Sequence, residues 1–284
     1  LLFRAGVLIE LGRLEQDRGR PAEAEPYYRQ ALAVRRQRLR ADHPEIATTL
    51  EMVGTSLLEQ DRLDEAAPVL EEVLTMRQSL LGDTHPQTAS ARFNLAALAR
   101  NRERYDEALA VFREVLAFDR EALGPDHPYV AGAWLEIGIT HARASQPDSA
   151  IAAYRTALEI IRRTQTDAHV IAQEAMGGIG QELTDAGRAR EAEPLLRRVL
   201  AIRLESLGAD SWRTGISENG LGANLWRQGR LVEAERYLVN GYEVIRAANG
   251  PEAGALRRLV EFFEATGRPA QAEPYRERLA EVSG

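Results

Sequence analysis

The sequence predicts an all-α fold, built as a solenoid of antiparallel helix pairs. Three observations carry this prediction: a short motif recurs every 42 residues, small residues recur at the same interval, and the apolar residues between them follow a helical period. A unit of this length holds two helices of ordinary length and their connections. Each unit is therefore expected to be one helical hairpin.

The recurring motif holds a histidine, which is followed by proline in three of four cases. It reads RADHP, GDTHP and GPDHP in turn and then fades to QTDAH, which spaces four histidines at 42-residue intervals: His43, His85, His127 and His169. Proline is favoured in the first turn of a helix, where its missing N–H costs nothing. Each motif therefore predicts a helix start, with the histidine capping or bracing it. Ser211, at the same place one interval later, is expected to act as a cap as well.

Small residues mark two further positions in the units. One position holds alanine in all seven units, with a final step of 38 residues: Ala24, Ala66, Ala108, Ala150, Ala192, Ala234 and Ala272. Twelve residues earlier lie Gly12, Gly54, Ala96, Gly138, Gly180 and Gly222, and in the last unit Val260. Helix axes about 8–10 Å apart leave no room for large side chains, so these positions predict where the two helices cross.

The second unit shows the helical period on both sides of a turn. Leu50, Val53, Gly54 and Leu57 follow the spacing i, i+3, i+4, i+7, and the same holds for Ala66, Leu70, Val73 and Leu74. The turn lies five residues before each alanine. It holds Gly19, Gly187, Gly229 and Gly267 in four units and Asp61, Glu103 and Ser145 in the others.

An aromatic residue or leucine lies four residues after the alanine in six units: Tyr28, Leu70, Phe112, Tyr154, Leu196 and Leu238. This pattern resembles the tetratricopeptide repeat, and the 42-residue period with the LG-x-D-H-P and EA-x-P-L phrases resembles its kinesin-light-chain type. The resemblance covers nearly the whole chain and implies a right-handed superhelical solenoid with a concave binding face. Bacterial examples of this type are often joined to signalling proteins.

The predicted array is a single domain over residues 1–284. Its units are 1–43, 44–85, 86–127, 128–169, 170–211, 212–253 and a short C-terminal cap unit, 254–284. Such units stack so that each one contacts its neighbours in the chain. The chain begins with Leu1 rather than methionine, in the middle of the pattern, so we expect an excised or processed segment of a longer protein.

Composition excludes several classes of function. A net charge of −7 and a pI near 5.5 argue against nucleic-acid binding, which needs clustered cationic side chains. The chain has no cysteine and no lysine, which removes thiolate metal sites, cysteine nucleophiles, the P-loop lysine and Schiff-base chemistry. No apolar run approaches the roughly 20 residues of a membrane helix. We expect a cytoplasmic protein.

The candidate chemical motifs favour structural roles. Equivalent atoms of successive repeats lie on the order of 10 Å apart, whereas zinc ligands lie within roughly 4 Å of each other, so the spaced histidines cannot share a metal. His141 occupies a leucine slot and is expected to be partly buried. The MGGIGQE segment lacks the strand of a phosphate loop; Gly177 and Gly178 mark either a soft point or a place where a ligand approaches the backbone. No catalytic residue, metal or cofactor is expected, and the chain is predicted not to be an enzyme.

The first helix of each unit has a second face, at positions equivalent to Thr48, Glu51, Thr55, Leu58 and Glu59, here called the groove slots. In the resembled family this face lines the concave groove. The first two units present acidic residues there and the fifth presents Glu174, Gln181 and Asp185. The predicted peptide-binding residues are Phe93, Asn94, Arg100, Asn101, Leu135, Arg143, Asn219, Trp226 and Arg227.

The chemistry of these side chains supports a peptide clamp. Arginine binds a carboxylate bidentately, asparagine holds a peptide backbone, and an apolar anchor receives a side chain. Replacing Arg100 and Arg143 by alanine is expected to weaken partner binding at least tenfold, about 1.4 kcal/mol. The alternative is that these are ordinary surface residues of charged helices. Trp134 lies on the packed side and is expected in the core.

The predicted function is that of a protein–protein interaction scaffold, which holds an extended or helical partner segment in its concave groove. Neither nucleic acid nor membrane is an expected partner, and the oligomeric state is left open. Two alternatives remain. The chain could be the regulatory or sensor tail of a larger signalling enzyme, with a kinase, protease or ATPase part elsewhere. It could also sense a small signalling peptide and change its superhelical pitch, with Gly177–Gly178 as the hinge.

Overall fold

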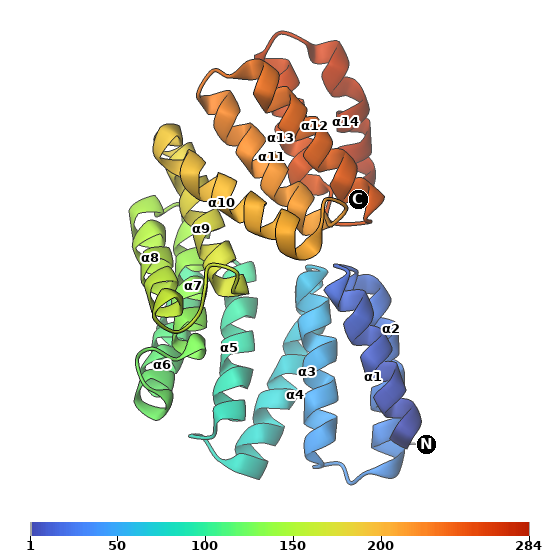
Figure 1. Ribbon diagram of the computed structural model, residues 1–284. Coiled ribbons are helices and arrows are strands. Elements are labelled where there is room, and N and C mark those ends of the chain that lie inside the picture. The colour runs from blue at the N-terminus through green and yellow to red at the C-terminus, as the bar shows by residue number, and fades with distance from the viewer. Residues whose placement is uncertain (1, 284) are drawn as a thin grey trace. The chain divides into compact units, whose positions relative to one another are not determined.

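A computed structural model describes residues 2–283 of the chain, and within these residues it contains fourteen α-helices and no strand (Figure 1). The all-α fold of tandem helix pairs is thereby confirmed. The helices are α1 (Leu2–Asp17), α2 (Pro21–Arg38), α3 (Pro44–Glu59), α4 (Leu63–Leu81), α5 (Pro86–Asn101), α6 (Tyr105–Leu123), α7 (Pro128–Arg143), α8 (Pro147–Thr164), α9 (Val170–Asp185), α10 (Ala189–Leu207), α11 (Trp212–Arg227), α12 (Leu231–Ala247), α13 (Ala253–Ala265) and α14 (Pro269–Ser283). None of them is both long and apolar enough to cross a membrane.

The helices form two compact units, residues 1–144 (unit 1) and 145–284 (unit 2). In each unit, neighbouring helices in the chain pack against one another, as α1 does on α2 and α11 does on α12. That the seven hairpins make one continuous array over residues 1–284 remains a prediction.

Four helices start with the same cap. The Nδ1 atoms of His43, His85, His127 and His169 accept hydrogen bonds from the backbone N–H two residues later, at 3.2, 3.1, 3.2 and 3.3 Å. Each bond satisfies one of the N–H groups that a helix start leaves without a partner. The predicted capping role of the histidines is confirmed. The prediction for Ser211 is wrong, because it stands at the cap position of α11 without a side-chain cap bond.

The recurring alanine lies at the centre of each hairpin, and all seven of these alanines are completely buried. The glycine on the facing helix is just as constrained. A β-carbon built on Gly12 would lie 2.4 Å from the ring of Tyr28, and one built on Gly180 would lie 2.6 Å from Leu196. Small residues therefore stand where the helices cross, as predicted. A β-carbon on Gly178 would lie 2.6 Å from the Tyr154 ring, which gives this helical glycine a packing reason.

The turn inside each hairpin adopts the left-handed backbone conformation in all seven repeats. Glycine provides it at Gly19, Gly187, Gly229 and Gly267, with φ between 74° and 78°. Three other residues adopt it despite carrying a β-carbon: Asp61 (φ 57°), Glu103 (φ 60°) and Ser145 (φ 56°). Left-handed φ costs a residue with a β-carbon roughly 1–2 kcal/mol, so these three turns are less favourable than the glycine turns.

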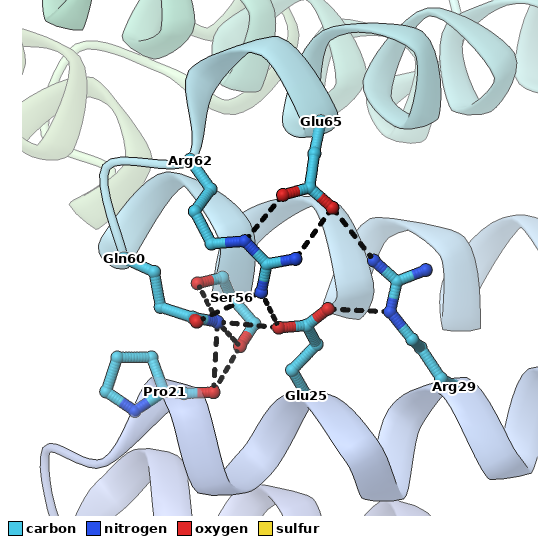
Figure 2. A network of polar contacts seen from close by, with 7 residues as sticks. All are labelled: Pro21, Glu25, Arg29, Ser56, Gln60, Arg62 and Glu65. Carbon is cyan, nitrogen blue, oxygen red and sulfur yellow. Dashed lines mark hydrogen bonds and ion pairs between the residues drawn. The ribbon is translucent and has the colours of Figure 1, made fainter.

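Polar side chains connect the first hairpin to the second at their turns (Figure 2). The guanidinium of Arg62 binds the carboxylates of Glu25 and Glu65, and Arg29 Nε donates to Glu25 Oε1 at 2.6 Å. Gln60 Nε2 donates to the other oxygen of Glu25 at 3.0 Å. Glu25 is thus a buried carboxylate that receives donors from both hairpins.

The same network recurs 168 residues later in unit 2. Glu193 accepts from Arg197, from Gln228 at 2.9 Å and from Arg230 at 2.9 and 3.0 Å. Burial alone would raise the pKa of Glu193, but the hydrogen bonds from Gln228, Arg197 and Arg230 outweigh it and lower the pKa to about 2. Two different pairs of hairpins are therefore fixed by the same charged contact.

Candidate functional site

In unit 1 the groove-slot side chains bond to one another across neighbouring hairpins. Glu51 of α3 accepts two hydrogen bonds from the buried guanidinium of Arg77, at 2.8 and 2.6 Å, and further bonds from Ser90 at 3.2 Å and Asn94 at 2.9 Å. Arg77 also donates to the backbone carbonyl of Gln87 at 2.9 Å. The acidic residue on this face is therefore neutralised by its own chain.

The predicted clamp residues of unit 1 also bind partners within their own chain. Arg100 forms an ion pair with Glu136 of α7, and its side chain is 11% exposed. Arg143 Nη1 donates to Asn101 Oδ1 at 3.0 Å. A partner carboxylate would have to displace Glu136 to bind the mostly enclosed Arg100, whereas Arg143 is exposed and has N–H groups besides the one bound to Asn101.

The two apolar anchors predicted in unit 1, Phe93 and Leu135, differ in exposure. Leu135 is 5% exposed, so the predicted exposure of this side chain on the groove face is wrong. Phe93 is half-buried and packs edge-on against Phe112, with ring centroids 5.0 Å apart. Leu135 therefore belongs to the packing between helices, whereas Phe93 keeps part of its ring exposed and stays a predicted anchor.

Unit 2 contains an open pocket of about 280 Å³ on the first helices of its last three hairpins. Gln181, Thr184 and Asp185 of α9, Ala223, Trp226 and Arg227 of α11, and Gly254, Arg257, Arg258 and Glu261 of α13 line it. Apart from Arg258, every one of these residues occupies a groove slot, once the 38-residue step into the last repeat is applied. The face assigned from the repeat register is thus hollowed in unit 2.

Trp226 and Arg227 are the predicted binding residues that line this pocket. Trp226 is half-buried and meets Phe262 edge-on, with ring centroids 5.7 Å apart. The guanidinium of Arg227 lies 4.7 Å from the centre of the Trp226 ring, at cation–π distance. An aromatic face and an exposed cation are therefore held side by side at one wall.

Asn219, predicted for the same groove, is completely buried, so its expected access to a partner is a further error. Its amide donates to the Leu238 carbonyl at 3.2 Å. The cause is a close approach of α11 and α12: a β-carbon on Gly215 would lie 2.7 Å from the Gly241 carbonyl. Two glycines allow the helix backbones to meet, and the neighbouring asparagine is enclosed.

Arg258 is the central residue that the sequence analysis missed. It donates from Nη1 to Asn219 Oδ1 and from Nη2 to Gln181 Oε1, both at 3.0 Å, and so links α9, α11 and α13. It occupies the position of Asn94, which donates to Glu51 in the same way. Carrying the repeat register through the shortened last step would have found it. Burial lowers the pKa of this guanidinium below the usual arginine value.

The remaining candidates of the sequence keep structural roles. His141 is half-buried, as predicted, and Trp134, which was expected in the core, is half-buried too. Across residues 2–283, no three His, Cys, Asp or Glu side chains are grouped to hold a metal ion. The pocket offers an aromatic ring, three arginines and two carboxylates, which suit recognition of a polar or charged group.

Comparisons with known proteins agree with this architecture. The family model of the tetratricopeptide repeat matches residues 3–79, 53–121, 87–163 and 171–247. No curated protein matches the chain at the sequence level. Three solved structures have a similar fold. BtubC (BKLC) from P. vanneervenii is 19% identical, with a TM-score of 0.60 over 84% of this chain and 93% of that chain. A Rap protein complexed with competence and sporulation factor is 13% identical, with a TM-score of 0.71 over 98% of this chain and 76% of that chain. A signal-transduction ATPase (STAND) with a tetratricopeptide repeat sensor from Pyrococcus horikoshii is 13% identical, with a TM-score of 0.60 over 96% of this chain and 41% of that chain.

All three sequence identities are low, so these structures show a similarity of fold alone. The family model, by contrast, covers most of the sequence and follows the 42-residue register found in it. Proteins built from this repeat generally mediate protein–protein interaction. The chain belongs to the tetratricopeptide repeat family.

Proposed function

We propose that this chain is a binding module rather than an enzyme, and that unit 2 holds a segment of a partner protein in its pocket. The observation that carries the proposal is the pocket itself, which three successive first helices line with groove-slot side chains. Trp226 offers an apolar surface there and Arg227 an exposed cation. Concave sites with an aromatic wall and a few polar groups are the usual places for ligands. The Rap protein complexed with a factor supports the proposal by analogy of fold.

A blocking variant tests the proposal. A β-carbon on Gly254 meets no atom within 4 Å, so a side chain can be added at this position, and Gly254→Trp is designed to fill the pocket. Ala201→Trp, at an exposed position of α10, is the matched control. Peptides selected from a phage-displayed library of random dodecamers on the unaltered protein are then synthesised, and their affinities are measured by fluorescence polarisation.

We expect Gly254→Trp to weaken these peptides at least tenfold and Ala201→Trp to leave them within twofold. Equal affinity for both variants would exclude this pocket. The double variant Arg100→Ala/Arg143→Ala is measured alongside, because it tests the clamp predicted in unit 1. Loss of binding in that double variant alone would move the site to unit 1. A cytoplasmic location belongs to the same proposal, and recovery of the protein in another cell fraction would contradict it.

A regulatory or sensor role within a larger signalling protein is the second candidate. The observation that favours it is the likeness to the STAND ATPase with a repeat sensor, of which this chain spans 41%. The coding sequence on both sides of this segment tests it. An open reading frame that continues into an ATPase, kinase or protease domain is the expected result, and stop codons directly at both ends would refute it.

A further inference from the structure

Arg258 differs from Arg77 and Arg100, two arginines of unit 1 that bond to neighbouring helices. Arg77 and Arg100 each bind a carboxylate, of Glu51 and Glu136. Arg258 binds two amide oxygens, and among the described residues no carboxylate lies within ion-pair distance of it; Asp185 and Glu261 attract it from further away. Enclosing a cation without an adjacent anion is unfavourable, because attraction from more distant carboxylates replaces only part of the lost hydration.

A second arginine of unit 2 shows that neutral partners alone do not define a site. Arg203 donates to the Gln173 side chain, to the Arg213 carbonyl and to Ser217, at 3.0–3.1 Å. It lies on the second helix of its hairpin and does not line the pocket. Arg258 does line it, so its guanidinium is accessible from the hollow side.

The charges around the pocket favour one additional negative group. Arg227 and Arg257 line it together with Arg258, and Asp185 and Glu261 oppose them. Three cations and two anions leave one positive charge without a counterpart. A single carboxylate completes the balance, whereas a doubly charged group would meet repulsion from the two carboxylates that are already present.

We propose that the pocket of unit 2 binds one carboxylate of the partner segment, which accepts a two-pronged hydrogen bond from Arg258. This inference rests on the proposed function and specifies the ligand chemistry of the same site. The carboxylate replaces the amide oxygen of Gln181, and it can accept two parallel N–H···O bonds from the guanidinium, which adds energy and geometric specificity. An aspartate or glutamate side chain and a free chain terminus both supply this group.

The test uses a peptide that binds the unaltered protein and is blocked by Gly254→Trp. Each acidic residue of the peptide is changed to its amide, and the C-terminus is made either free or amidated. Affinities are measured for the unaltered protein and for Arg258→Gln. We expect one of these changes to weaken binding at least tenfold in the unaltered protein and less than twofold in Arg258→Gln. Which change has this effect identifies the source of the carboxylate.

Two results would overturn the inference: a pocket-blocked peptide whose carboxylates can all be neutralised without loss, or an equal loss in both proteins. Either result leaves the proposed function standing, because the pocket still binds the peptide. The substitutions are made in the peptide, so the comparison stands even if Arg258→Gln lowers stability. Side-chain NMR signals of Arg258 give a second readout. They are expected to shift on addition of the acidic peptide and not of its amide analogue, and equal shifts with both would also count against the inference.

Discussion

In unit 1, Arg77 and Arg100 each pair with a carboxylate from another helix, whereas in unit 2 Arg258 meets the amide oxygens of Asn219 and Gln181. Arg100 and Arg258 both lie on the first helix of their hairpins, whereas Arg77 lies on a second helix. The difference shows that the repeat position fixes where a side chain lies, while the neighbouring side chains decide whether its charge is paired within the chain. A face whose charges are matched internally is suited to holding hairpins together, and a face with an unmatched cation is suited to binding.

The largest effect is expected from Glu51→Ala in unit 1. Arg77 is buried and would lose its carboxylate partner, and breaking an enclosed ion pair in this way typically costs about 3–5 kcal/mol. The free energy of unfolding, measured by urea denaturation, should fall by this amount. Glu261→Gln, at an exposed carboxylate of the unit 2 pocket, is the control and should change it by less than about 0.5 kcal/mol. Similar losses in both variants would remove the contrast between the two faces.

The next effect compares two arginines directly. Arg100→Met leaves Glu136 without its ion pair and is expected to lower the free energy of unfolding by about 2 kcal/mol. Arg258→Met removes a cation with no carboxylate at ion-pair distance, but it leaves the Oδ1 atom of the buried Asn219 without a donor, so a smaller loss of about 1 kcal/mol is expected. Thermal denaturation of the two variants provides the measurement. A loss for Arg258→Met as large as that for Arg100→Met would assign Arg258 a structural role.

A pH profile tests the charged contact that both units share. The pKa of Glu193 is lowered from 4.5 to about 2 in the folded protein, so the folded state binds fewer protons than the unfolded state in this window. The stabilisation is therefore fully present above pH 4.5 and is lost as the pH falls towards 2. Glu193→Gln should lower the free energy of unfolding by about 1.5 kcal/mol at pH 7 and by progressively less below pH 4.5. Glu71→Gln, at an exposed position of α4, serves as the control, and a pH-independent difference for Glu193→Gln would contradict the assignment.

The smallest effect concerns the turns. Glu103 adopts a left-handed φ of 60° in unit 1, where Gly187 adopts 76° at the equivalent place in unit 2. Glu103→Gly should raise the free energy of unfolding by about 0.5–1 kcal/mol, and Gly187→Glu should lower it by a similar amount. Calorimetry of the two variants checks both signs. A destabilised Glu103→Gly would show that the side chain makes a compensating contact.

Much of the fold followed from the sequence because the deciding interactions are local. A histidine two residues before an N–H caps its own helix, and a small residue is needed wherever two helices of one hairpin cross. The prediction of a cap at Ser211 was wrong because its position alone did not ensure the side-chain hydrogen bond. The candidate site was predicted less well. Leu135 and Asn219 stand in the expected slots, yet neighbouring helices cover them.

Arg258 shows which properties of a residue follow from the sequence and which follow from the tertiary structure. Its slot follows from the 38-residue step to Ala272, so the sequence by itself determined the repeat, the helix starts, the crossings and the face on which this side chain stands. Its partners lie 39 and 77 residues earlier, and those of Arg100 and Asn94 lie 36 and 43 residues away. Which charges are matched and which are left for a ligand was decided by the tertiary structure, because side chains from two or three hairpins meet there and each neutralises or encloses another.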